Sequence, residues 1–63
     1  MTAMSSDELI RRLQAAGWRL VRIKGDHHVF LHPDNPNHIS VPHPRKDLGK
    51  GIAHRLLRKA GLK

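Results

Sequence analysis

The sequence predicts a small α+β domain in which two helices cover one face of a three-stranded antiparallel sheet. A capping signal followed by apolar residues at helical spacing predicts a helix near the N-terminus. Three short segments bounded by Gly, Pro, Asp and Asn then predict strands, and a second helical pattern occupies the C-terminal end. Because the strands are consecutive and the helices flank them, the order α-β-β-β-α is typical of an α+β fold. We expect residues 1–63 to form a single domain.

The first helix is predicted to begin at a capping box formed by Ser5 and Glu8. Acidic residues in this first turn favour the positive end of the helix dipole. The apolar residues that follow at helical spacing are Leu9, Ile10, Leu13 and Ala16. Gly17 is suited to the left-handed conformation that ends a helix, so we expect about three helical turns before it.

The three strands are predicted from β-branched and aromatic residues between turn signals. We expect strands at 18–24, 27–32 and 38–42, joined by a Gly25-Asp26 turn and by a longer turn at 33–37 that contains two prolines. Ile39 and Val41 should share one face of the third strand. Trp18, a lone large aromatic at the start of the first strand, is predicted to lie in the core rather than to stack on nucleotide bases.

The second helix is predicted over residues 49–60, after a basic loop at 43–47. Its apolar residues recur at helical spacing, and Gly61 should close it. The helix carries four basic residues, namely Lys50, Arg55, Arg58 and Lys59. They form either a solvated face that keeps a small domain soluble or a platform for phosphate groups.

The composition restricts the function classes. Twelve Lys and Arg against five Asp and Glu give a formal charge of +7, which predicts attraction to nucleic acid, an anionic membrane or an acidic protein. Cysteine is absent, and no apolar segment resembles a signal peptide or reaches the roughly 20 residues that span a bilayer. We therefore expect a cytoplasmic protein without a membrane partner.

Imidazole is the abundant side chain that can exchange protons near neutral pH, and three of the six histidines lie between Gly25 and Pro33. His27, His28 and His32 could in principle gather around zinc. Neighbouring strand residues point to opposite faces, however, so His27 and His28 cannot easily share one ion. We predict no metal and no cofactor.

Five short motifs resemble the HicA toxin family in their order and spacing. They are Lys24-Gly25-Asp26-His27-His28, His32-Pro33-Asp34, Val41-Pro42-His43-Pro44, Lys46-Asp47-Leu48 with Gly51, and Lys59-Ala60-Gly61-Leu62. Each motif is weak alone, but five in register across so short a chain are specific. The resemblance implies a fold like that of double-stranded-RNA-binding domains and a metal-independent ribonuclease that cleaves messenger RNA. It also implies a HicB antitoxin as partner, and we expect the free toxin to be a monomer.

The resemblance implies that His27 is the catalytic histidine, because it directly follows the Gly-Asp pair. RNA cleavage without metal needs a base for the ribose 2′-hydroxyl, an acid for the leaving 5′-oxygen and cations near the phosphate. His27 could serve as base or as acid. The cations that we expect to contact phosphate are Lys24, Arg45, Lys46 and Lys50.

His28 and Asp26 are candidates for a second catalytic or orienting role. Strand alternation predicts that Asp26 shares a face with His28 and Phe30, whereas His27 shares a face with Val29. Asp26 is thus expected to partner His28 rather than His27, unless the turn at Gly25 rotates its side chain.

The remaining histidines favour structural interpretations. His32 and His43 each precede a proline and are expected to shape loops and bond backbone groups, with a smaller chance that His43 lies on the RNA path. His38 and His54 are expected to be solvated. Without the resemblance, a histidine in a strand is more often structural than catalytic, so the alternative functions are a non-catalytic RNA-binding module and a binder of an acidic protein.

Overall fold

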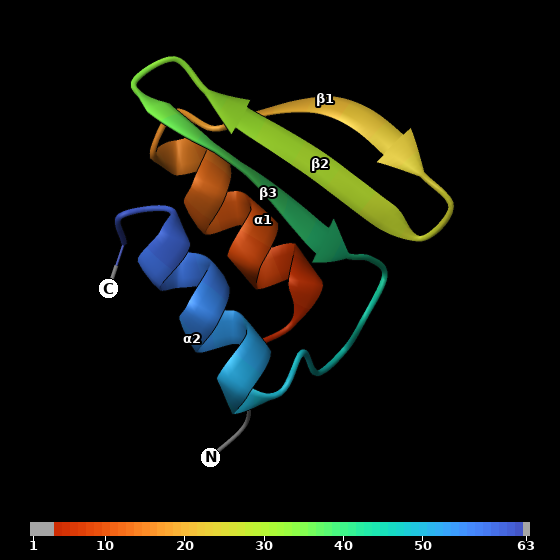
Figure 1. Ribbon diagram of the computed structural model, residues 1–63. Coiled ribbons are helices and arrows are strands. Elements are labelled where there is room, and N and C mark those ends of the chain that lie inside the picture. Colours follow the sequence, from red (N-terminus) through yellow and green to blue (C-terminus); the bar gives the residue numbers. More distant parts are fainter. Residues whose placement is uncertain (1–3, 63) are drawn as a thin grey trace.

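The computed structural model describes residues 4–62, which contain the predicted order of elements. These are α1 (Ser6–Ala15), β1 (Arg19–Lys24), β2 (His27–His32), β3 (Asn35–Pro42) and α2 (Lys50–Lys59). The strands form one antiparallel sheet in the order β1-β2-β3, and both helices lie on the same side of it (Figure 1). The predicted α+β fold is confirmed. No helix in the described part of the chain is both long and apolar enough to cross a membrane.

The start of α1 follows the predicted capping box. The Ser5 side-chain oxygen accepts a hydrogen bond from the Glu8 backbone N–H at 3.2 Å, which satisfies one of the free donors of the first turn. Leu9 and Leu13, one turn apart, are fully buried against the sheet. The apolar stripe that predicted the helix is therefore the stripe that holds it in the fold.

The core lies between the helices and the inner face of the sheet. Its buried apolar residues are Leu9, Leu13, Trp18, Phe30, Ile39, Val41, Leu48, Ala53, Leu57 and Ala60. Trp18 is only 2% exposed, which confirms its predicted place in the core. Each fully buried aliphatic or aromatic side chain contributes about 1.5–3 kcal/mol relative to an exposed one, so this small set of residues supplies most of the driving force for folding.

Alternation along β2 separates its side chains between two faces. Phe30 is fully buried and half-buried His28 shares its face, whereas His27 and Leu31 are exposed on the outer face. No helix covers that outer face within residues 4–62 (Figure 1). The predicted separation of the two neighbouring histidines is confirmed.

The third strand is longer than predicted. It begins at Asn35 rather than at His38, and the turn before it contains only Pro33 and Asp34. Pro36 lies inside the strand, where the prediction had placed it in a loop. β3 is an edge strand, so a residue without a backbone N–H is tolerated near its start.

The helix α2 is held by Ala53, Leu57 and Ala60, which are buried, while Ile52 on the same helix stays 43% exposed. Its bounds agree with the predicted helix to within one residue at each end. Gly49, the residue before it, provides no side-chain cap.

Gly17 gives a prediction for stability. It has a positive φ of 101°, and a Cβ atom there would come within 2.9 Å of His32 Nε2. We expect Gly17→Ala to lower the free energy of unfolding by about 1–2 kcal/mol, because alanine disfavours this conformation and must displace the His32 ring. Urea unfolding followed by circular dichroism measures the change.

Gly51 provides the matched control for Gly17. It lies in α2, has no positive φ, and a Cβ added there meets no atom within 4 Å. Gly51→Ala should raise the free energy of unfolding by about 0.5–1 kcal/mol, because alanine is the better helix former. Equal effects of the two substitutions would contradict the role assigned to Gly17.

Candidate functional site

The predicted catalytic residue lies at the end of the sheet formed by the β1–β2 turn. The His27 side chain is 52% exposed, and its Nδ1 atom lies 3.2 Å from the Asp26 carboxylate oxygen Oδ1. Asp26 therefore partners His27, and the prediction that it would partner His28 is wrong. Asp26 precedes the first residue of β2, so its side chain follows the turn and not the alternation of the strand.

The Asp26 carboxylate places a negative charge beside the imidazole of His27. Both side chains are more than half exposed, so solvent weakens their attraction and the pair adds little to stability. The imidazole of His27 remains accessible to solvent and ligands.

His28 occupies a different environment on the inner face. Its ring meets the edge of the His43 ring, with centroids 4.6 Å apart and planes at 73°. The Nδ1 atom of His28 is buried and has no hydrogen-bond partner among the described residues. A buried polar atom without a partner is uncommon and costly, so this ring is held by its packing against His43 rather than by a polar network.

Ser6 connects the first turn of α1 to the loop that follows β3. Ser6 is buried, and its Oγ lies 2.7 Å from His43 Nδ1. The same oxygen accepts a hydrogen bond from the Arg45 backbone N–H at 2.9 Å, and the Ser6 N–H donates to the Arg45 carbonyl at 2.9 Å. On the other side of the ring, His43 Nε2 lies 3.7 Å from Asp7 Oδ1.

Ser6 and Asp7 were not predicted to be neighbours of a histidine. Ser6 is 37 residues from His43, and its position beside the cap residue Ser5 gave it no distinguishing signal. The contacts of Ser6 with His43 and Arg45 join this loop to α1, which confirms the expectation that His43 shapes its loop.

Three of the four cations predicted to contact phosphate lie on the β1–β2 hairpin or on the loop bonded to its turn. Lys24 is the cross-strand partner of His27 in the β1–β2 pair, so the two side chains share the outer face. The loop that carries Arg45 and Lys46 is tied to the turn, because the His43 backbone N–H donates to the Asp26 carbonyl at 2.7 Å. Both basic residues line a hollow of about 410 Å³ next to the start of α1.

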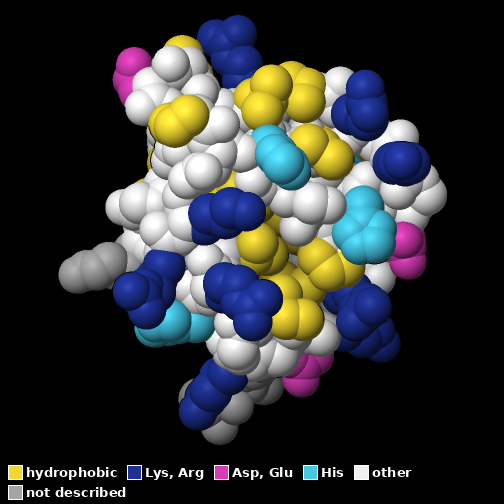
Figure 2. Space-filling model, viewed as in Figure 1, with side chains coloured by type: hydrophobic (Ala, Val, Ile, Leu, Met, Phe, Trp, Pro, Cys, Tyr) yellow, Lys and Arg dark blue, Asp and Glu magenta, His cyan; other side chains and the backbone are white. Residues whose placement is uncertain are grey.

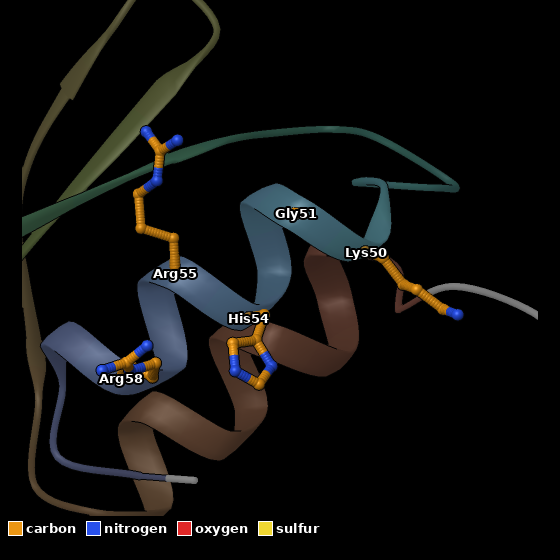
Figure 3. A pocket seen from close by; sticks show the side chains of 5 residues that line it. All are labelled: Lys50, Gly51, His54, Arg55 and Arg58. Carbon is orange, nitrogen blue, oxygen red and sulfur yellow. The ribbon is translucent and has the colours of Figure 1, made fainter.

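Lys50, the fourth predicted cation, lies on a separate surface. It lines a hollow of about 470 Å³ along α2, together with Gly51, His54, Arg55 and Arg58. Figure 3 shows that these side chains spread away from one another: Arg55 extends toward the sheet and Lys50 extends away from the helix. The hollow therefore presents positive charge without side chains that converge on one point.

The other histidines have the predicted structural or solvated positions. His32 Nε2 lies 3.0 Å from the Ala16 carbonyl, and its Nδ1 accepts a hydrogen bond from the Asp34 N–H at 2.9 Å. His38 and His54 are exposed. Among residues 4–62, no three His, Asp or Glu side chains come together as a set of metal ligands.

Positive charge is spread widely over the surface. On the face drawn in Figure 2, Lys and Arg side chains surround α2 and the sheet, and acidic side chains are sparse. Together with the formal charge of +7, this face favours binding to polyanions.

Comparison with known proteins identifies the family. A profile of the HicA toxins of bacterial toxin–antitoxin systems matches residues 6–62, which is nearly the whole chain. The chain belongs to the HicA toxin family. The resemblance seen in the five sequence motifs is confirmed, and the HicA assignment covers both helices and the whole sheet.

A solved structure supports the assignment at the level of the fold. The chain is similar to a chain of a HicA3 and HicB3 toxin–antitoxin complex, with 38% sequence identity and a TM-score of 0.83. The match covers 95% of this chain and 97% of the other. No curated protein sequence matched significantly.

Proposed function

We propose that this HicA family member is an endoribonuclease that cleaves messenger RNA without a metal ion and uses His27 for proton transfer. The observation that carries the proposal is the exposed imidazole of His27, with Asp26 at its Nδ1 and Lys24 directly across the strand pair. An exposed imidazole beside a carboxylate and a cation on an open face fits the needs of phosphodiester cleavage.

The proposed reaction begins with attack of the ribose 2′-oxygen on the adjacent phosphorus. The 2′-hydroxyl loses a proton, and the leaving 5′-oxygen gains one as the P–O bond breaks. His27 Nε2 takes part in one of these two transfers, and Asp26 stabilises the imidazolium when the ring is protonated. Lys24, Arg45 and Lys46 offset the negative charge that grows on the phosphate.

We also propose that a HicB-like antitoxin neutralises this chain in the cytoplasm. The solved relative is a HicA3 and HicB3 complex, and the strong positive charge of this chain would attract an acidic partner. A partner that covered the exposed His27 would block access of RNA to the imidazole.

Cleavage of RNA in the presence of EDTA tests the proposed activity. We expect the purified protein to shorten a 5′-labelled messenger RNA at discrete positions, with EDTA causing no loss of rate. Denaturing gel electrophoresis detects the fragments, and a preparation of the His27→Ala variant controls for contaminating nucleases. Intact RNA after long incubation with folded protein that still binds RNA would instead identify a non-catalytic RNA-binding module.

A further inference from the structure

The strand β1 is the least covered element of the fold. All six of its residues are exposed, whereas β2 and β3 each bury at least one side chain. Its exposed apolar residues are Leu20 at 41%, Val21 at 52% and Ile23 at 58%. Figure 1 shows β1 as the strand farthest from the helices, so nothing in residues 4–62 packs over both of its faces.

The outer edge of β1 also has free backbone groups. In the order β1-β2-β3, β1 pairs only with β2, and no other backbone hydrogen bond within the described residues involves positions 19–24. A free strand edge is a template on which another extended segment can pair.

Except for Val21, the side chains of β1 are divided by chemistry between the two faces of the sheet. Leu20 and Ile23 pair with Phe30 and His28, which face the helices, so both apolar side chains extend the inner face. The basic residues Arg19, Arg22 and Lys24 pair with outer-face residues of β2. An irregularity between Leu20 and Arg22 inserts Val21 into the strand, and Val21 lines a hollow on the outer face beside Arg22 and Lys24, so it is the one apolar exception to this division within residues 19–24.

This pattern disfavours pairing between two copies of the chain. In an antiparallel pair centred on β1, Arg19 of one copy would lie opposite Lys24 of the other. In a parallel in-register pair, each cation would lie beside the same cation of the second copy. Like charges directly opposite each other destabilise a strand pair. The same cations would favour a strand that carries carboxylates on the outer face.

We propose that the free edge of β1 binds an extended acidic segment of a partner protein as a fourth strand of the sheet. Apolar side chains of that segment lie beside Leu20 and Ile23 and extend the inner layer. Its carboxylates lie beside Arg19 and Arg22 on the outer face. The proposal does not depend on the ribonuclease activity, because it concerns the strand edge and is tested by binding alone.

A short synthetic peptide in which Glu alternates with Val and Ile is the probe. We expect the fluorescently labelled peptide to bind the full chain, and a peptide of the same composition with all Glu residues at one end to bind at least about tenfold more weakly. Fluorescence anisotropy measures both affinities. Equal binding of the two peptides would mean that charge alone attracts them and would overturn the proposal.

Charge reversal on β1 and on α2 locates the binding surface. Arg19→Glu with Arg22→Glu should weaken binding of the alternating peptide about tenfold or more, whereas Arg55→Glu with Arg58→Glu, which changes the net charge equally, should weaken it less than about threefold. The variant that carries Arg19→Glu and Arg22→Glu should bind a peptide in which Lys replaces each Glu of the alternating peptide. This binding would show that the variant is folded. A larger effect of the α2 pair would overturn the proposal.

Amide hydrogen exchange provides the structural readout. Added peptide should slow exchange at residues 19–24, because a new strand pairs with their outward N–H groups. Protection confined to residues 50–59, or a dimer of the wild-type chain that forms through β1 without peptide, would contradict the proposed partner.

Discussion

Replacing His27 with alanine is expected to lower the rate of RNA cleavage by about 10²- to 10⁴-fold while RNA binding changes little, because the substitution removes a proton-transfer group and leaves the cations in place. The His27 side chain is about half exposed and makes no core contact, so the fold should be retained. Single-turnover cleavage of a labelled RNA measures the loss, and fluorescence anisotropy of an uncleavable analogue measures binding.

Two further histidine variants show whether a loss of cleavage is specific to His27. His38→Ala removes another exposed imidazole next to the buried strand residue Ile39, and it should leave the cleavage rate within about twofold of the parent. His28→Ala removes the ring on the opposite face. If His28→Ala stops cleavage and His27→Ala does not, with both proteins folded, the proton-transfer role belongs to the ring beside His43.

Replacing Ser6 with alanine is expected to lower the free energy of unfolding by about 2–4 kcal/mol. The change leaves the Arg45 N–H and His43 Nδ1 without their Ser6 Oγ partner. Both bonds are part-buried, so each loss should cost about 1–2 kcal/mol, the lower part of the range for a buried polar group without a partner. A domain of this size has a total stability of only about 3–9 kcal/mol. Urea unfolding should therefore show Ser6→Ala as a marginally folded protein.

Ser5 is the matched control for Ser6, because it is the neighbouring serine and its Oγ accepts a single hydrogen bond from the Glu8 N–H. Ser5→Ala removes this helix cap and should cost about 1 kcal/mol. If Ser5→Ala were as damaging as Ser6→Ala, the link between α1 and the loop at Arg45 would not be the cause of the effect.

The elements of the fold were predictable because each has a local signal. The cap at Ser5, the glycine at Gly17 and the alternation through β2 depend on neighbours in sequence, and all are found in the structure. The start of β3 was not predictable in this way, because Pro36 usually indicates a loop. Only its place on an edge strand, which is a property of the whole sheet, makes proline acceptable there.

The candidate site was predictable in its position and less so in its contacts. Lys24 follows from the register of a tight hairpin, which places it across from His27. Asp26 could not be assigned from alternation, because it belongs to the turn. The contact of Ser6 with His43 joins residues far apart in sequence, and no local pattern encodes such a contact.

The exposure of β1 has a consequence for how the isolated protein resists degradation. Because β1 buries no side chain, it can detach from β2 at the cost of its ladder hydrogen bonds and cross-strand contacts while the core around Phe30 stays intact. Such partial opening would leave the exposed residues Arg19, Arg22 and Lys24 in a segment with an unpaired backbone, where proteases that cleave after basic residues act. The lifetime of the free chain in a cell would then be set by the opening of one strand, well before the whole domain unfolds.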